Sequence, residues 1–375
     1  MKYPISVVVP TKDRYKYLKS LIEMIIGFET DEIELIIQDN STNNEDFVKW
    51  LSDKKFDWLK YYYNPERLTS IQNFDLAISH STGECVTFIG DDDGIVRNIV
   101  DCAKWMIENN VEAVRSLGVE YQWPECCGLG IIKMGKSNRI IEYSNPIKDL
   151  IRMFKEGGRL NHIPVTYAGI VKREILDNLF QDYGTYFPGG ASADMANGVA
   201  LCFYVKRYVK LNVPIIITGT SKNTGSVKDR KRFIPFSEIP FISSSVAPNW
   251  EGNLPKYWFG VFVWPESAIK ALRALHQESF IQFICFEKIF ARAVINAKVK
   301  PSMFYSYCDP RMLNYYVAKQ FVQYFLYVLT QKIRSLWSLF LQKINLKKNS
   351  RIDNISIAEK ILLNSSIDFS RLKYK

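Results

Sequence analysis

An apolar strand that runs directly into three aspartates constrains the fold of this chain more than any other feature. Residues 84–89 are short, apolar and partly β-branched, which predicts a strand buried in a sheet. Asp91, Asp92 and Asp93 follow it, and adjacent carboxylates raise one another's pKa unless a cation or hydrogen-bond donors offset their charge. Hard oxygen ligands of this kind suit Mg²⁺ or Mn²⁺. An acidic turn at the surface is the alternative that these residues alone leave open.

The first forty residues predict a strand, a helix and a second strand. Residues 5–9 form a continuous β-branched run closed by Pro10, and residues 33–38 form a second apolar run. Residues 17–28 between them have helical spacing. In such a unit, ligands gather beyond the carboxyl ends of the strands. The polar residues expected at these two ends are Thr11, Asp13 and Asp39.

Three sequence blocks, taken in order, resemble the family 2 type of nucleotide-sugar-dependent glycosyltransferase. They are residues 4–14, residues 34–42, and residues 70–74 running on to the acids at 90–93. The resemblance covers about the first hundred residues. It implies the GT-A fold, an α/β arrangement with a mixed, mostly parallel sheet flanked by helices, and a hexosyltransferase-type activity.

The resemblance also implies roles for single residues. Thr11 and Asp13 would hold the nucleoside, and Asp39 would accept a hydrogen bond from the base, although Asp39 is also a good cap for the following helix. Arg67 and Asn73 would lie beside the diphosphate and the base. In the acid cluster, Asp91 would reach the ribose or bound water, Asp92 is a further candidate contact, and Asp93 would bind the metal that bridges the diphosphate.

A second candidate site follows a loop of small residues at 188–193. Asp194 comes next, about a hundred residues after the acid cluster, and it opens an apolar helical segment. In inverting members of the family an acid at this separation is the general base on the acceptor hydroxyl, so the resemblance gives this role to Asp194. Capping of the helix by Asp194 is the alternative.

The chain divides into three expected parts. Residues 1–234 form the GT-A domain, with a strand expected at 165–171. Residues 235–310 form a helical subdomain, with one helical stretch over 266–298.

The third part, residues 311–375, is a basic tail. Of the net charge of +10, the tail carries +9, because it holds twelve Lys or Arg against three Asp or Glu. Its apolar residues form one helical stripe and its polar ones fall mainly elsewhere, which predicts a helix lying on an anionic membrane surface. A packing or dimerisation helix is the alternative. The stripe comprises Val322, Phe325, Leu329, Ile333, Leu336, Trp337, Phe340 and Ile344.

Composition indicates a cytoplasmic protein that is peripheral on the inner face of the membrane. No apolar run is long enough to span a bilayer, and no signal-peptide pattern precedes the first strand. The seven cysteines form no CxxC pair, which fits a reducing compartment. Nucleic acid is a poor partner for the tail because aromatic residues occupy its apolar stripe.

The process expected from the resemblance is bacterial surface polysaccharide synthesis. A sugar would pass from a nucleoside diphosphate sugar to a hydroxyl of a glycan acceptor, including a lipid-linked one, with metal assistance and inversion. One alternative is a nucleotidyltransferase, although the loop after the first strand lacks the usual glycines. The other is a non-catalytic membrane-surface protein that keeps the fold. Oligomeric state is left open.

Overall fold

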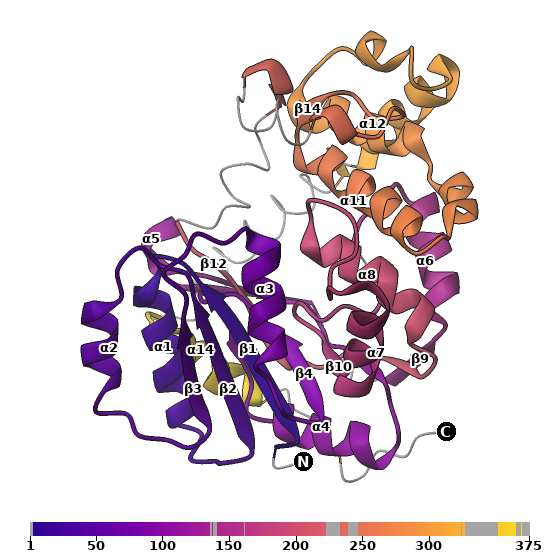
Figure 1. Cartoon of the computed structure of the whole chain (residues 1–375). Helices are drawn as coiled ribbons and strands as arrows, with labels where there is room; N and C mark the ends of the chain where they lie inside the picture. The colour runs from indigo at the N-terminus through magenta and orange to yellow at the C-terminus, as the bar shows by residue number, and fades with distance from the viewer. Residues whose placement is uncertain are drawn as a thin grey trace, which may run out of the picture.

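The computed structural model describes residues 3–135, 137, 141–160, 162–222, 233–238, 247–323, 325–326, 352–364 and 369. A large sheet crosses the molecule and helices cover both of its faces (Figure 1). The strands of this sheet are β1 (Ile5–Thr11), β2 (Ile33–Asp39), β3 (Leu59–Tyr63), β4 (Cys85–Phe88), β6 (Ala113–Arg115), β9 (Ile141–Ser144), β10 (Ile170–Lys172) and β11 (Tyr208–Leu211).

The order of these strands is β3-β2-β1-β4-β10-β6-β11-β9. The first four are parallel to one another, β10 is antiparallel to both of its neighbours, β6 and β11 are parallel, and β9 is antiparallel to β11. It follows that β6 runs in the same direction as β4. The carboxyl ends of β1, β2, β4, β6 and β11 therefore lie along one edge of the sheet.

The helices are amphipathic segments that cover the sheet or pack on one another. They are α1 (Tyr15–Ile26), α2 (Glu45–Leu51), α3 (Ser70–Ser79), α4 (Ile99–Glu108), α5 (Pro124–Cys127), α6 (Pro146–Lys155), α7 (Arg173–Tyr183), α8 (Ala193–Tyr204), α11 (Gly260–Ala274), α12 (Phe286–Ala297) and α14 (Ile355–Leu363).

Two hydrophobic cores lie on opposite faces of the sheet, and successive residues of β1 point into them alternately. Val8 belongs to the core that includes α6, α7, α8, α11 and α12. Val7 and Val9 belong to the core that includes α1, α4 and α14. Because both faces are covered, the strand is apolar throughout, as its sequence predicts.

A smaller sheet packs against the acid segment. It comprises β5 (Gly94–Ile95), β12 (Ile216–Thr220), β7 (Val119–Gln122) and β8 (Ile131–Met134) in the order β5-β12-β7-β8. Gly219 of β12 approaches the aspartates so closely that a Cβ there would lie 1.7 Å from the carbonyl oxygen of Asp92. Only glycine allows this contact between the two segments.

The helical region after residue 247 shares a core with α8. Two glycines make the contact possible, because a Cβ on Gly190 would lie 2.2 Å from the Cα atom of Ser267 in α11, and one on Gly189 would lie 2.6 Å from the backbone of α11. The expected helical stretch over 266–298 is broken into α11, a 3-10 turn at Glu278–Phe283 and α12. A domain boundary at residue 234 stays a prediction.

Part of the expected tail packs on the first domain. Helix α14 lies beside α1 in Figure 1, and Ile355, Ala358 and Leu362 are buried in the core that includes α1. Glu359 is also buried, and it accepts a hydrogen bond from the backbone N–H of Arg97 at 3.2 Å. The helix near the end of the tail therefore contributes to the core on this face of the sheet.

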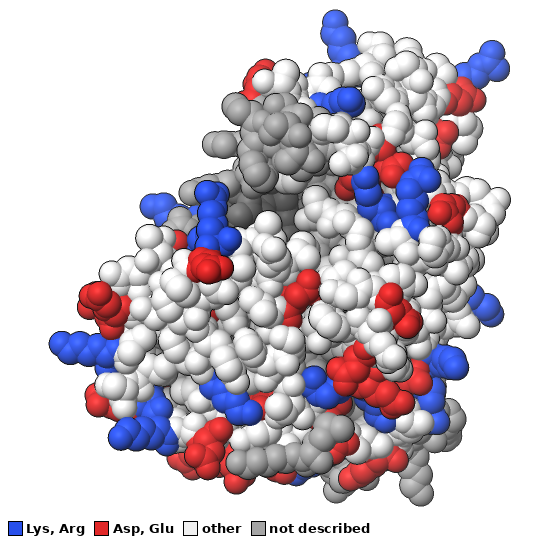
Figure 2. All heavy atoms as spheres, in the orientation of Figure 1, with Lys and Arg blue, Asp and Glu red and all other residues white. Residues whose placement is uncertain are grey.

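The rest of the predicted stripe is described only in part. Val322 and Phe325 are exposed, while Leu329, Ile333, Leu336, Trp337, Phe340 and Ile344 lie outside the described residues. Within the described part of the chain, no helix combines the length and apolar character needed to cross a bilayer. In Figure 2, basic and acidic residues alternate over the visible face, in keeping with the small net charge of residues 1–310.

Candidate active site

A cavity of about 320 Å³ opens at the carboxyl edge of the sheet, beyond β1, β2 and β4. Four of the residues predicted from the sequence line it: Thr11, Asn73, Asp91 and Asp92. The other residues that line it are Pro10, Lys12, Arg14, Asn40, Leu68, Thr69, Ser70, Phe74, Phe88, Ile89, Gly90 and Tyr167.

The guanidinium of Arg14 joins the first two aspartates. It lies 3.0 Å from a carboxylate oxygen of Asp91 and 2.7 Å from one of Asp92. Ser221 donates a further hydrogen bond to Asp92 at 2.7 Å, and Thr11 donates one to Asp91 at 2.8 Å. Burial raises the pKa of Asp91 to about 7, although the charge of Arg14 opposes the rise. These protein groups offset part of the charge on Asp91 and Asp92, and a metal cation beside the acids stays a prediction.

Asp93 does not line the cavity, and its carboxylate has three hydrogen-bond donors. Its carboxylate accepts hydrogen bonds from the N–H of Gly90 at 2.7 Å, the N–H of Gly219 at 2.6 Å and the hydroxyl of Tyr167 at 2.9 Å. Burial and the neighbouring charge of Asp92 raise the pKa of Asp93 to about 8. To reach a ligand in the cavity, this carboxylate would have to turn away from those donors, so metal binding by Asp93 stays a prediction.

Three predicted donor-binding residues do not line the cavity. The Asp39 carboxylate is fully buried and accepts hydrogen bonds from the hydroxyls of Tyr15 and Tyr61, both at 2.6 Å. Asp13 joins two loops by accepting from the N–H of Thr42 at 2.9 Å. Arg67 is exposed. These side chains shape the surroundings of the cavity, and direct contact with a nucleotide stays a prediction for each.

Two polar groups in the cavity wall are suited to a ligand. The carboxamide oxygen of Asn73 is buried and has no hydrogen-bond partner among the described residues, although such groups are normally paired. The exposed Lys12 brings a positive charge to the cavity. A ligand with a donor for Asn73 and negative charge for Lys12 would complement both groups.

The acid cluster fits a divalent cation that is shared with a ligand. Among the described residues, no three Asp, Glu, His or Cys side chains converge as a ready metal site. Mg²⁺ and related cations, however, often bind through one or two carboxylates and complete their shell with phosphate oxygens and water. Asp91 and Asp92 at the cavity wall supply two such carboxylates. The donor set therefore fits a cation that arrives with a phosphate-bearing ligand.

Asp194, in the first turn of α8, acts electrostatically on the same region. Burial raises the pKa of Tyr167 well above its usual value, and the charges of Asp93, Asp194 and Asp92 raise it further. Tyr167 lines the cavity, so Asp194 lies within electrostatic reach of it. Asp194 itself is half-buried and does not line the cavity.

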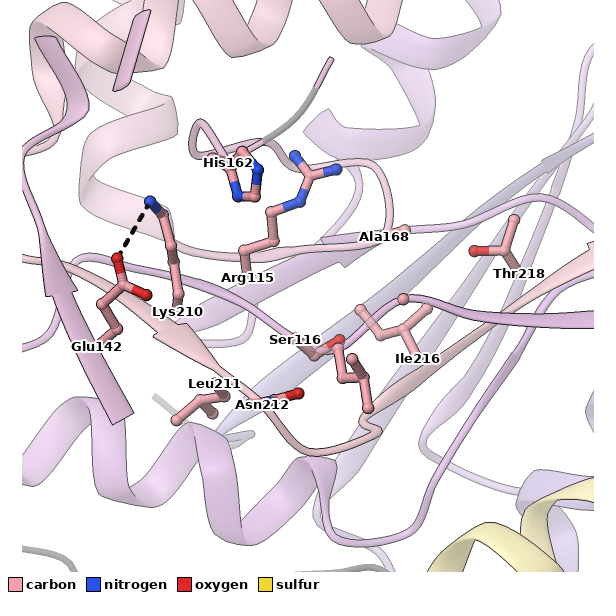
Figure 3. A pocket seen from close by; sticks show the side chains of 12 residues that line it. Arg115, Ser116, Glu142, His162, Ala168, Lys210, Leu211, Asn212, Ile216 and Thr218 are labelled. Carbon is pink, nitrogen blue, oxygen red and sulfur yellow. Dashed lines mark ion pairs between the residues drawn. The ribbon is translucent and has the colours of Figure 1, made fainter. Parts of the chain in front are cut away.

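A second cavity, of about 570 Å³, lies farther along the same sheet edge (Figure 3). Figure 3 shows His162 and Arg115 on one side of it, the Lys210–Glu142 ion pair at 3.7 Å on another, and Thr218 of β12 at its far end. Its remaining lining residues are Ser116, Leu117, Gly118, Ala168, Leu211, Asn212 and Ile216.

Adjacent residues separate the two cavities, since Tyr167 lines the first and Ala168 lines the second.

The predicted strand at 165–171 is wrong over most of its length, because only residues from Ile170 onward are in β10. Ala168 instead has a left-handed backbone with φ of 54°. Its N–H donates to the carbonyl of Phe88 at 3.0 Å, which anchors this turn beside the end of β4. Arg115, in the second cavity, also experiences the charge of Asp194.

Several site residues were not predicted from the sequence. Tyr167 and Gly219 reach the acids from segments far along the chain, and no local pattern marks either one. Asn40 lies in the sequence block at residues 34–42, but the sequence did not predict its structural role. Its amide donates to the carbonyls of Asn64 and Glu66, which holds the loop at the cavity mouth.

Comparison with known proteins gives a family match over part of the chain and a similar fold. Residues 6–120 match the family model described as glycosyl transferase family 2. The structure is similar to S. aureus TarS 1–349 in complex with UDP-GlcNAc, with a TM-score of 0.50 and 18% identity, over 80% of this chain and 76% of that one. At this identity the likeness concerns the fold alone.

Another similar structure is the mannosyltransferase PcManGT from Pyrobaculum calidifontis in complex with GDP-Man and Mn²⁺. It has a TM-score of 0.39 and 17% identity, over 90% of each chain, which is too low for a comparison of individual sites. No curated protein sequence matches this chain.

Proposed function

We propose a nucleotide-sugar reaction for this chain, which is a glycosyltransferase of the GT-A fold with a family 2 region at residues 6–120. The proposed donor is a nucleoside diphosphate sugar, and the proposed acceptor is a hydroxyl of a bacterial surface glycan, including a lipid-linked one. TarS 1–349, whose structure in complex with UDP-GlcNAc has a similar fold, supports a donor of this class.

The cavity at the carboxyl edge of β1, β2 and β4 carries the proposal. It combines two carboxylates, the basic side chains of Lys12 and Arg14, and the unpaired oxygen of Asn73. A nucleoside diphosphate sugar offers matching groups, namely charged phosphate oxygens for the bases and hydroxyl or N–H donors for Asn73. We assign the phosphates to the side of Lys12 and Arg14, and the nucleoside to the side of Thr11 and Asn73.

The acid cluster would hold a Mg²⁺ or Mn²⁺ ion together with the donor. Asp91 and Asp92 line the cavity, and Asp93 is the ligand expected from the family resemblance. When bound, such an ion offsets the charge that develops on the leaving nucleoside diphosphate. The protein groups keep the acids in place before the donor arrives, because Arg14 and Ser221 bind the same carboxylates.

Asp194 is the proposed general base for direct displacement with inversion. It lies at the start of α8, where a half-buried carboxylate can accept the proton of an acceptor hydroxyl. Its charge acts on Tyr167 of the donor cavity and on Arg115 of the second cavity. An acid between donor and acceptor would influence both sites in this way.

The second cavity is the proposed site of the acceptor. It shares the sheet edge with the donor cavity, and one turn of chain at Tyr167 and Ala168 separates them. His162 contributes an imidazole whose pKa is lowered by burial and by nearby basic groups, so it is neutral and able to bond hydroxyls near neutral pH. Replacing His162 by Phe should slow transfer to an acceptor and leave donor binding unchanged.

Peripheral attachment to the inner face of the cell membrane through the tail is a further proposal. Of the predicted tail, this proposal covers only residues 311–351, because α14 is part of the core. The exposed aromatic and aliphatic side chains of Tyr315, Phe321, Val322 and Phe325 support it. A vesicle-binding assay in which the exposed Phe321 and Phe325 are replaced by Ser tests it, since full binding by the variant would argue against attachment by the tail.

A thermal-shift panel tests the donor assignment. Sugars of UDP, GDP, dTDP and CMP are added with and without Mn²⁺, because a ligand that binds the folded state raises the midpoint of unfolding. We expect a metal-dependent rise with one nucleotide class, which is lost in Asp91→Asn. The absence of any rise with all four classes would contradict the proposed donor.

A further inference from the structure

A third cavity, separate from the two at the sheet edge, lies where α6 meets α11 and α12. Its volume is about 170 Å³, and its lining joins two arginines and an asparagine to Gly260, Val261 and Trp264, with no acidic residue. The side chains that form it come from the segment after α6, the first two turns of α11, and one face of α12. They are Arg159, Gly260, Val261, Trp264, Arg292 and Asn296.

Two arginines face this cavity without a carboxylate partner among the described residues. Arg292 donates to the backbone carbonyls of Glu156 and Gly157 at 3.1 and 3.0 Å, and Arg159 forms no ion pair within the described part of the chain. Burial and the charge of Arg159 together lower the pKa of Arg292 to about 10. Two like charges that repel across a small cavity are stabilised by an anion between them.

A glycine positions Arg292. Gly157 has a φ of 88°, and a Cβ there would lie 2.7 Å from a guanidinium nitrogen of Arg292. This space lets the guanidinium reach the carbonyl groups at the end of α6, which need donors in any helix. Those two hydrogen bonds come from one nitrogen, Nη2, so the remaining N–H groups of Arg292 are left for other partners.

The start of α11 adds donors of the same kind. Phe262 and Val263 are the first residues of this helix to donate backbone hydrogen bonds, to the carbonyl of Phe259 at 2.8 and 3.0 Å. Gly260 and Val261, which precede them in the chain, line the cavity, and no side chain caps this end of the helix. The first amides of a fifteen-residue helix carry partial positive charge and favour an anion.

We propose that this cavity is a binding site for a phosphate group. Two guanidiniums, two helix amides and the Asn296 side chain supply donors to a tetrahedral oxyanion, and the indole of Trp264 borders it. The volume suits one phosphate with a small part of the group that it esterifies. The same chemistry is offered by free phosphate and by the phosphate of a lipid headgroup. This site does not depend on the proposed donor or acceptor.

Isothermal titration of the full chain with sodium phosphate, in EDTA and at matched ionic strength, tests the site. We expect the dissociation constant to rise at least tenfold in Arg159→Gln, since one of two charges on the anion is lost. Arg159 is exposed and makes no structural hydrogen bond that the structure describes, so this variant should fold. Arg152→Gln is the matched control, because Arg152 is an exposed arginine of α6 outside the cavity.

A second arm distinguishes the two sources of phosphate. Binding to phosphatidylcholine vesicles is measured with and without phosphatidic acid, for the chain with both arginines intact and for both variants, each also carrying Phe321→Ser and Phe325→Ser so that the tail does not contribute. The site is supported if Arg159→Gln loses binding of free phosphate or of phosphatidic acid and Arg152→Gln keeps it. The ligand that binds then identifies the source of the phosphate group. Binding that Arg159→Gln leaves unchanged, or no binding in either arm, overturns it. The thermal shift with nucleotide sugars should be the same in all three proteins, so failure here is separable from failure of the donor assignment.

Discussion

Replacing Arg14 by Gln should destabilise the fold by removing the guanidinium that forms ion pairs with both Asp91 and Asp92. The guanidinium lies 3.0 and 2.7 Å from the two carboxylates, whose side chains are 3% and 5% exposed. Removing one partner of a buried pair costs about 3–5 kcal/mol. Because Arg14 itself is 23% exposed, we expect the lower end, about 3 kcal/mol.

The loss should depend on pH in a defined direction. Burial raises the pKa of Asp91 to about 7 and that of Asp93 to about 8, above the values of an unfolded chain. A carboxyl with a raised pKa binds its proton more tightly in the folded state, so stability falls as the pH rises toward that pKa. Loss of Arg14 raises the pKa of Asp91 further. The difference between variant and wild type should therefore be larger at about pH 8 than at about pH 5, where Asp91 is protonated in both proteins.

Urea unfolding in the presence of EDTA measures both effects. Lys16→Gln serves as the control, because Lys16 is 69% exposed and pairs with Glu125 at 3.2 Å. An exposed pair of this kind contributes about 0–1 kcal/mol. A loss for Arg14→Gln no larger than that for Lys16→Gln would refute the reasoning, as would a loss that is equal at both pH values.

Three further changes have defined outcomes. Gly219→Ala should abolish donor binding and lower the midpoint of thermal unfolding, since the new methyl group would meet the carbonyl of Asp92 at 1.7 Å. Glu34→Gln should destabilise by roughly 2 kcal/mol at neutral pH in urea unfolding, since a buried carboxylate loses charge-assisted hydrogen bonds, including one from Lys60. Burial raises the pKa of Glu34, but these hydrogen bonds outweigh burial and lower the pKa below its usual value. The stability of the wild type should therefore fall as the pH drops through the acid range, and the variant should lack this loss. Asp194→Asn should reduce transfer about 10²-fold or more and leave the thermal shift with donor unchanged.

Each of these three predictions has an outcome that would contradict it. Gly252→Ala is the control for Gly219, because a Cβ at Gly252 meets nothing within 4 Å, and equal donor binding by the two variants would argue against the close contact. For Glu34, the same acid-side loss in variant and wild type would be the contrary result. For Asp194, unchanged transfer would remove it as the base.

Local patterns predicted much of the first half of the fold. The apolar runs at 5–9 and 33–38 predicted β1 and β2, and the helical spacing of residues 17–28 predicted α1 to within two residues, because the period of the apolar residues is contained within each segment. The polar residues that follow β1 and β4 could also be predicted, since parallel strands bring their ends to one edge. Thr11, Asp91 and Asp92 therefore line the cavity as expected.

Long-range contacts account for what sequence reasoning missed. The strand expected at 165–171 is interrupted because Ala168 takes a left-handed backbone beside Phe88, which an apolar run does not signal. The helix expected over 266–298 is divided because the chain turns to pack α12 on α11. Helix α14 was predicted as part of a surface tail, because the residues of α1 on which it packs lie more than three hundred positions earlier in the sequence. The orientation of Asp93 depends on Gly219 and Tyr167, which only the folded chain brings near.

Electron paramagnetic resonance of Mn²⁺ tests most directly whether the acid cluster and the cavity form a nucleotide-sugar site. Free Mn²⁺ gives a sharp signal that is lost on binding. We predict that the protein removes this signal only when the nucleoside diphosphate that gives the thermal shift is present, because the described acids complete a metal site together with phosphate oxygens. We also predict that Asp91→Asn restores the signal of free Mn²⁺. Equal loss of the signal in Asp91→Asn, or no loss with any nucleoside diphosphate, would contradict the account.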